Sequence, residues 1–169
     1  MSGISPMPAR HLLQPKTLDD MLLYVMWQLQ ACAGSVVVRL CESEFGITRR
    51  EWRMVAQLAV HEGVQSSELA RHAALDRART SRALTGLEAK GLVERTPRPG
   101  DRREVLVRLT PQGRALHAAL LPRVMQINRE LLSALDEGEV DQLERFFARL
   151  QQRAEAMRAD ARGAAERAP

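Results

Sequence analysis

The sequence has few aromatic residues. Two Trp, one Tyr and three Phe are spread over 169 residues. Proteins that bind single-stranded nucleic acid usually stack its bases on aromatic side chains, and this composition provides no such platform. Among nucleic acids, it therefore favours duplex DNA as a partner over single strands.

Cysteine is also scarce. Cys32 and Cys41 lie nine positions apart in one predicted helix, which places them on opposite faces and roughly 13.5 Å apart along the helix axis. They cannot form a disulfide with each other in that helix, and neither belongs to a CxxC pair or a Cys/His cluster. We therefore expect no metal site. Cys32 is predicted to be the more inward-facing of the two.

Long hydrophobic runs are missing. No stretch approaches the 18 consecutive apolar residues of a membrane span, and the start, MSGISPMPARHLLQPK, lacks the apolar block of a secretory signal. We expect a cytoplasmic protein without a membrane partner. The motifs HExxH, GxSxG and GxxxxGK[ST] are absent from the sequence, and its four histidines are scattered, so we expect neither an enzyme nor a bound cofactor.

The positive charge is concentrated in one segment. The chain carries a net charge of +4, whereas residues 71–103 alone hold nine basic and four acidic residues. This excess favours a binding surface for a polyanion. The alternative is that arginine only solvates the surface.

Hydrophobic spacing and capping residues predict mostly helices. An apolar stripe predicts a long first helix at residues 18–43, and Thr48 begins a capping box before a second helix. Further along, the pattern predicts two short helices, a hairpin with a proline- and glycine-rich tip, and two long helices. Their predicted ranges are 68–72, 77–90, 92–109, 111–131 and 137–160.

This order predicts a mainly α fold with a small β-hairpin wing, a winged helix-turn-helix flanked by long N- and C-terminal dimerisation helices. The apolar stripes of the terminal helices are too long for the small winged lobe to cover, so a homodimer is expected. The predicted organisation comprises a flexible N-terminal tail at 1–16, dimerisation helices at 17–45 and 111–160, the DNA-binding lobe at 48–110 and a frayed tail at 161–169.

Residues 91–116, GLVERTPRPGDRREVLVRLTPQGRAL, carry a family resemblance. The segment resembles the end of the recognition helix, the wing and the following helix of the MarR family of bacterial transcription regulators, and the likeness extends over about residues 18–160. The resemblance implies a dimeric winged helix-turn-helix protein that binds a pseudo-palindromic operator in double-stranded DNA. It further implies that the protein usually represses and releases DNA when a small aromatic acid binds.

The resemblance also implies DNA-contacting residues. The wing pattern Asp-x-Arg falls on Asp101 and Arg103, with Arg102 between them, where arginine can enter the minor groove. On the recognition helix, the candidates are Arg77, Arg79, Ser81 and Arg82, whereas Leu84 and Leu87 are predicted to face the core. The alternatives are a salt-bridged turn that touches nothing and a solvent-facing helix surface, because sequence does not determine the rotation of the helix.

Two kinds of signal remain open. One is a hydroxybenzoate- or hydroxynicotinate-like carboxylate in a cleft of the dimer, where Arg53 or His61 would meet the carboxylate and Trp52 the ring. The candidate lining residues are Gln28, Cys32, Ser35, Trp52, Arg53 and His61. Trp52 could equally be a core residue. The other signal is oxidation of Cys32, although a cysteine on an apolar stripe is usually a packing residue.

Overall fold

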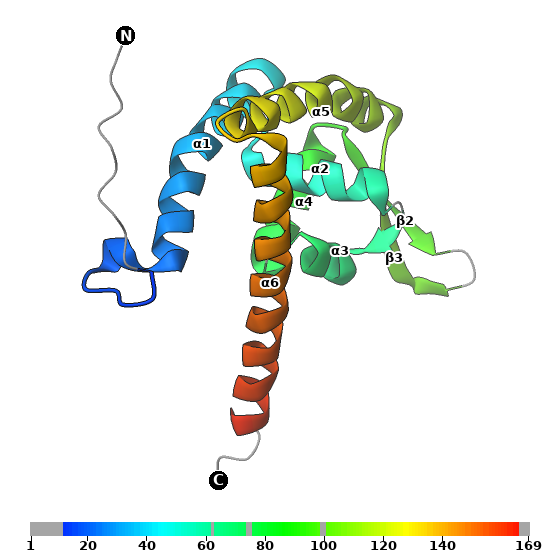
Figure 1. Ribbon diagram of the computed structural model, residues 1–169. Helices are drawn as coiled ribbons and strands as arrows, with labels where there is room; N and C mark the ends of the chain where they lie inside the picture. The colour runs from blue at the N-terminus through cyan, green and yellow to red at the C-terminus, as the bar shows by residue number, and fades with distance from the viewer. Residues whose placement is uncertain (1–11, 62, 74–75, 99–100, 166–169) are drawn as a thin grey trace. The chain divides into compact units, whose positions relative to one another are not determined.

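The computed structural model describes residues 12–61, 63–73, 76–98 and 101–165, without the side chains of residues 98, 101–104 and 165. The chain is mainly helical with a small antiparallel sheet, as the sequence predicts (Figure 1). In chain order, the elements are η1 (Leu18–Asp20), α1 (Leu22–Phe45), α2 (Arg49–Val60), β1 (Val64–Gln65), α3 (Ser66–His72), α4 (Arg77–Ala89), β2 (Val93–Arg98), β3 (Asp101–Leu109), α5 (Pro111–Leu132) and α6 (Glu137–Ala165).

The predicted helix boundaries follow their capping residues. Thr48 and Glu51 form the expected capping box, in which the Glu51 N–H donates to the Thr48 hydroxyl and the Thr48 N–H donates to the Glu51 carboxylate. Asp136 and Glu139 repeat this arrangement at the start of α6. Gly46 follows α1 with a φ of 63°, a left-handed conformation that favours glycine. These local signals therefore predict most helix ends correctly.

Three boundaries differ from the prediction. Thr17 precedes the short 3-10 turn η1, where the Asp20 carboxylate accepts hydrogen bonds from the Thr17 N–H and hydroxyl, and α1 itself begins at Leu22. Helix α3 begins at Ser66, two residues before the predicted start at residue 68. Helix α6 continues to Ala165, beyond the point where the frayed tail was expected to begin.

The sheet contains a strand that the sequence pattern does not predict. Val64 and Gln65 form β1, which pairs antiparallel with β3 through Val107 and Leu106, and β3 also pairs with β2. In the described part of the chain, the sheet order is thus β1-β3-β2. A two-residue strand is too short to show an alternating pattern, so only its partner reveals it.

One hydrophobic core unites α2, α3, α4 and the sheet. Met54, Leu58, Leu69, Leu84 and Val107 are fully buried in it, one or two from each element. Each such side chain stabilises the fold by roughly 1.5–3 kcal/mol on burial. This packing fixes the rotation of α4, which the sequence left open.

A crowded joint connects α4, the sheet and α5. The Thr110 hydroxyl donates to the Gly91 carbonyl at 2.7 Å and accepts from the Gly113 N–H at 3.0 Å, so it caps α5 and holds the turn after α4. The Thr110 N–H donates to the Leu92 carbonyl at 3.1 Å. A Cβ at Gly113 would collide with that same carbonyl oxygen. Only glycine fits there without a backbone shift.

A partly buried ion pair joins the start of α2 to the end of α4. The Lys90 Nζ donates to both Glu51 carboxylate oxygens, at 2.9 and 2.8 Å. The Glu51 carboxylate passes so close to α4 that a Cβ at Gly86 would lie 2.5 Å from its Oε1. Gly86 therefore lets the carboxylate cross the helix surface and reach Lys90.

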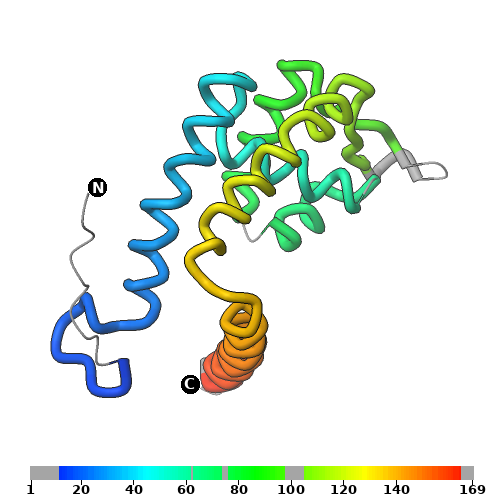
Figure 2. The backbone as a smooth tube through the Cα atoms, turned by 45° about the horizontal axis from the view of Figure 1, so that its top comes forward, coloured from blue at the N-terminus to red at the C-terminus, as the bar shows by residue number. Residues whose placement is uncertain are grey.

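The chain divides into two compact units, residues 1–127 and 128–169. Within the first unit, the C-terminal half of α1 lies beside α5 (Figure 2), and Arg123 donates to Glu44 through both terminal nitrogens, at 2.9 and 3.0 Å. The second unit contains the end of α5 and all of α6. None of the helices in the described residues is long and apolar enough to cross a membrane.

Candidate nucleic-acid interface

Helix α4 begins at a well-defined cap. The Arg79 N–H donates to the Asp76 carboxylate at 2.8 Å, and the Arg79 Nε lies 3.1 Å from the other carboxylate oxygen. That backbone hydrogen bond, together with the nearby Arg79 guanidinium, lowers the pKa of the Asp76 carboxyl below its usual value. The cap thus stabilises the backbone of the first turn of α4, which carries the basic side chains.

The two faces of α4 differ sharply. Thr80, Ala83, Leu84 and Leu87 are buried, which confirms the prediction that both leucines face the core. The four predicted DNA-contacting residues, Arg77, Arg79, Ser81 and Arg82, are all exposed. Packing of the opposite face therefore turns all four toward solvent.

Thr85 extends this outward face by one turn. It is exposed, and it follows Ser81 by four residues and Arg82 by three, so the three side chains share one face of α4. Thr85 is not among the residues predicted from the sequence. The spacing from Ser81 and Arg82 would have indicated it once the buried positions of the helix were known.

One cavity lies between the start of α2 and the first turns of α4. It has a volume of about 440 Å³ and is lined by Thr48, Arg50, Glu51, Arg79, Arg82 and Ala83. Arg50 is exposed and joins the two predicted arginines of α4 at this cavity. Sequence reasoning missed Arg50, because only the fold brings the start of α2 to α4.

A second cavity lies between the start of α3 and the other side of α4. It has a volume of about 450 Å³ and is lined by Ser66, Ser67, Arg77 and Ser81. Three hydroxyls and one guanidinium thus meet there, all of them able to donate to an oxyanion. The exposed residues of α4 are flanked on both sides by a cavity.

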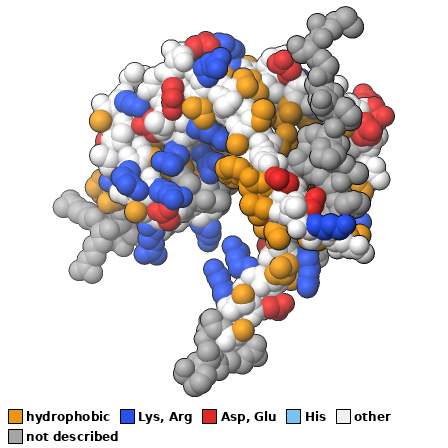
Figure 3. Space-filling model, turned by 90° about the vertical axis from the view of Figure 1, so that its left-hand side faces the viewer, with side chains coloured by type: hydrophobic (Ala, Val, Ile, Leu, Met, Phe, Trp, Pro, Cys, Tyr) orange, Lys and Arg blue, Asp and Glu red, His pale blue; other side chains and the backbone are white. Residues whose placement is uncertain are grey.

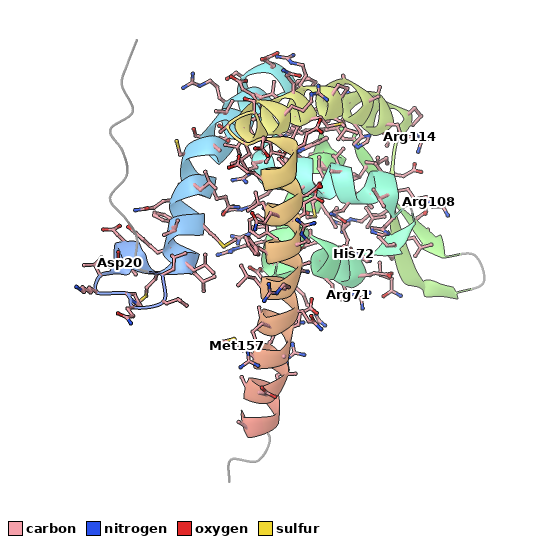
Figure 4. All side chains as sticks on the ribbon, viewed as in Figure 1. Asp20, Arg71, His72, Arg108, Arg114 and Met157 are labelled. Carbon is pink, nitrogen blue, oxygen red and sulfur yellow. The ribbon has the colours of Figure 1, made fainter. Side chains whose placement is uncertain are left out.

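The wing is formed by β2 and β3, with a register shift at Pro97 and Arg98. Arg95 on β2 lies 3.3 Å from the Glu88 carboxylate on α4 and so ties the wing to that helix. The predicted contacts Asp101, Arg102 and Arg103 belong to β3, but their side chains lie outside the described residues. Figure 4 labels Arg71 on α3 and Arg108 on β3, two further exposed basic side chains of the lobe.

The three predicted effector residues on α2 and at its C-terminal end contact different partners. Trp52 is buried, 7% exposed, and its ring stacks on that of His117 at 5.6 Å. The Arg53 Nη1 donates to the Ala73 carbonyl at 3.3 Å, whereas the His61 ring stacks on His72 at 4.1 Å. Trp52 is thus a core residue in this chain.

The predicted effector residues on α1 lie elsewhere. The Gln28 side chain donates to Asp19 at 3.0 Å, and the Ser35 hydroxyl donates to the Cys32 carbonyl at 2.7 Å. None of the six predicted effector residues lines the cavities between α2 and α4, between α3 and α4 or between α1 and α5. Their part in effector binding stays a prediction.

The cysteine prediction is wrong in one respect. Cys32 is exposed and Cys41 is buried, so Cys41 is the inward-facing cysteine. Burial raises the pKa of the Cys41 thiol, and the nearby Arg49 opposes this shift in part. The reason for the error is that the stripe shared by Cys32, Leu29 and Val36 is not buried among the described residues, where both apolar side chains are about half exposed.

A third cavity lies between α1 and α5. It has a volume of about 380 Å³ and is lined by Val36, Arg39, Leu40, Ser43, Glu44, Arg123, Gln126 and Ile127. Arg123 is held by Glu44, whereas Arg39 is an exposed guanidinium beside an apolar wall. An apolar hollow with a few polar groups is the usual form of a small-molecule site.

Comparisons with known proteins point to one family. The MarR family model matches residues 45–104. The HTH-type transcriptional repressor NicR of Pseudomonas putida is 34% identical over 93 residues, which span 55% of this chain and 59% of NicR, less than two thirds of that relative. The multiple antibiotic resistance protein MarR of Salmonella typhimurium is 31% identical over 109 residues, which span 64% of this chain and 76% of MarR.

The fold is also similar to that of a solved structure. BpsR of Bordetella bronchiseptica, whose structure concerns the regulation of its DNA binding by 6-hydroxynicotinic acid, superposes with a TM-score of 0.73 at 20% identity. The superposition covers 82% of this chain and 98% of the BpsR chain. This similarity shows a shared fold.

Proposed function

The chain belongs to the MarR family of transcriptional regulators, and on that premise we propose that it is a repressor that binds a pseudo-palindromic operator in duplex DNA as a homodimer. The observation that carries this proposal is the outward face of α4. Four polar or basic residues are exposed there on a helix whose opposite face is locked into the core. Such a helix can enter the major groove without unpacking.

The homodimer is supported by apolar side chains that the single chain leaves exposed. On α1, Leu23 is 79% and Trp27 57% exposed, and Figure 3, which faces the side of the molecule where α1 lies in Figure 1, shows hydrophobic side chains gathered there. Along α6, Phe147, Leu150 and Met157 are also exposed. Monomeric proteins rarely expose such contiguous apolar surface, so we assign both helices to contacts between two copies.

The wing completes the proposed interface. Its two strands hold Asp101, Arg102 and Arg103 at the start of β3, next to the hairpin tip. We propose that Arg103 enters the minor groove and that Asp101 orients a neighbouring guanidinium. Replacing Arg103 with alanine should weaken DNA binding by about 1.5–3 kcal/mol without unfolding the chain. Unchanged affinity at matched salt would remove the wing from the interface.

For the effector, we propose a small aromatic carboxylate of the hydroxybenzoate or hydroxynicotinate type. The cavity between α1 and α5 supports this class, because Val36, Leu40 and Ile127 can contact a ring and Arg39 can meet a carboxylate. The regulation of BpsR by 6-hydroxynicotinic acid motivates the choice of that compound as a first probe. Of the residues predicted from sequence, Ser35 and Cys32 lie closest along the chain to this cavity.

The test begins with selection of a binding duplex from a random pool and measurement of its affinity by fluorescence anisotropy over a salt series. A repressor of this kind should show a salt slope of about 0.9 per phosphate contact and half-site centres about 34–36 Å apart. A slope near zero would contradict DNA binding. Footprints confined to one half-turn would contradict the symmetric dimer.

The effector is tested by calorimetric titration with 6-hydroxynicotinic acid and 4-hydroxybenzoic acid. We expect one site per subunit and at least a tenfold loss of DNA affinity, which requires about 1.4 kcal/mol of coupling. Arg39→Ala should abolish the response while leaving DNA affinity without the acid unchanged. If none of the acids binds, the carboxylate proposal fails.

Oxidation of Cys32 is the second candidate signal, and the exposure of this thiol favours it. Peroxide should then release DNA from the wild type but not from Cys32→Ser. Cys41→Ser serves as the control, because its buried sulfur is shielded from the oxidant. Equal responses of the wild type and Cys32→Ser would exclude this candidate.

A further inference from the structure

We infer that Arg50, on the helix in front of the helix-turn-helix, forms an oxyanion site with Arg79 and Arg82 that receives one phosphodiester of the DNA backbone. This inference rests on the proposed function, because it requires that α4 binds duplex DNA. It assigns a contact to α2, which neither the sequence pattern nor the residues of the recognition helix indicate. The site is the cavity of about 440 Å³ between α2 and α4.

Three guanidinium groups from two helices line this cavity. Arg50 lies in the first turn of α2, and Arg79 and Arg82 lie three residues apart on one side of α4. The fixed Thr48 and Asp76 caps hold the starts of both helices, so the backbones that carry these arginines are set before DNA arrives. A preorganised site loses less conformational entropy on binding.

The negative charges around the cavity are already matched. Both oxygens of the Glu51 carboxylate accept from Lys90, and one also accepts from the Thr48 N–H at 2.7 Å. Asp76 pairs with Arg79. Among the residues that the structure describes, neither Arg50 nor Arg82 forms an ion pair with a carboxylate. The cavity therefore retains positive charge that no described side chain neutralises.

The position of Arg50 favours a phosphate over a base. The outward face of α4 around Ser81 and Thr85 is the part that would enter the groove, whereas Arg50 lies beside that helix on another element. Phosphates border the groove, so a side chain flanking the inserted helix meets the backbone first. A guanidinium fork can bind two phosphate oxygens at once.

The test compares two duplexes of equal length, the selected operator and a random-sequence pool. Arg50→Ala should weaken binding to both by the same factor, roughly tenfold, because a phosphate contact carries no sequence information. The salt slope should fall by about 0.9 for each lost contact, or about 1.8 for a dimer. Arg82→Ala should also weaken binding to both, because Arg82 lines the same site, whereas Ser81→Ala on the outward face should lose more affinity for the operator than for the pool.

Two further variants separate charge from geometry. Lys16→Ala, which removes an exposed lysine from the segment before η1, controls for the loss of one positive charge. Arg50→Lys should restore the salt slope but only part of the affinity, since lysine keeps the charge and loses the fork. Since Arg50 is exposed, its variants should melt like the wild type.

The outcomes separate this inference from the function on which it depends. If Arg50→Ala binds both duplexes like Lys16→Ala, the site is wrong while the repressor proposal stands. A loss confined to the operator would show base reading by Arg50 and would also overturn the phosphate assignment. If the wild type binds neither duplex, the repressor proposal and this inference fall together.

Discussion

Two neighbouring parts of the winged lobe use their residues in opposite ways. The joint, formed by Gly91, Leu92, Thr110 and Gly113, is crowded, and its hydrogen bonds run between backbone and side chain in fixed pairs. The rim, formed by Arg50, Arg77, Arg79 and Arg82, is exposed, and most of its charge is left for a partner.

The joint and the rim also differ in how they relate to the segment that carries the family resemblance. The segment that carries the family resemblance in the sequence, residues 91–116, contains the whole joint, and its glycines and threonine are needed by the backbone. All four residues of the rim lie outside that segment, although the family model, which matches residues 45–104, includes them. The joint is therefore required by the fold, whereas the proposed DNA contacts depend on exposed side chains that the packing of the lobe does not require.

The largest expected effect is at the joint. Gly113→Ala should destabilise the chain by more than about 3 kcal/mol, because the new Cβ meets the Leu92 carbonyl, which is fixed by its bond from Thr110. Denaturant unfolding measures this loss. Gly138→Ala in the first turn of α6 is the matched control, since its Cβ meets only Asp136 Oδ1 at 3.4 Å and should not destabilise. Equal stability of the two variants would mean that the joint can relax.

The second-largest effect is expected at the ion pair between Glu51 and Lys90. Glu51→Gln should cost about 2 kcal/mol of folding stability, because two hydrogen bonds from Lys90 and one from Thr48 lose their charged acceptor. Glu44→Gln breaks the exposed pair with Arg123 and should cost less than about 1 kcal/mol. Thermal unfolding of both variants checks the contrast. If both substitutions reduced folding stability equally, the Glu51–Lys90 pair would contribute no more than the exposed Glu44–Arg123 pair, and the prediction would be wrong.

At the rim itself, the expected change is in binding and not in folding. Arg82→Ala should reduce operator affinity by about 1.5 kcal/mol, roughly tenfold, because Arg82 is exposed at the centre of the outward face of α4. Its unfolding curve should overlay that of the wild type. A variant that unfolds more easily but binds normally would reverse the distinction between rim and joint.

The smallest effect concerns the cap of α4 and depends on pH. The folded-state pKa of Asp76 is lowered, so its carboxylate stabilises the fold above its ordinary pKa of about 3.9, and this contribution is lost as pH falls through the lower folded value. Asp76→Asn keeps an acceptor for the Arg79 N–H but cannot ionise. Urea midpoints of the two proteins should differ at neutral pH and converge below about pH 3. A constant difference across this range would contradict the assignment.

Much of the fold could be predicted because its signals are local. The caps at Thr48, Asp76 and Asp136 and the glycines after α1 and α4 mark helix ends through contacts within a few residues. The β1 strand could not be predicted in this way, because two residues carry no period. The exposure of Cys32 could not be predicted either. An apolar stripe indicates that a helix face is buried in the functional protein, but it does not indicate whether the same chain or a second copy buries that face.

The candidate interface divides along the same line. The sequence by itself determined the order of the elements, the basic segment and the candidates on α4, since helical spacing and charge are properties of neighbouring residues. Only the tertiary structure decided which side of α4 is buried, that Arg50 lines one cavity with Arg79 and Arg82, and that Trp52, Arg53 and His61 have different partners. These facts depend on contacts between residues distant in the chain, and such contacts are set by packing and not by local propensity.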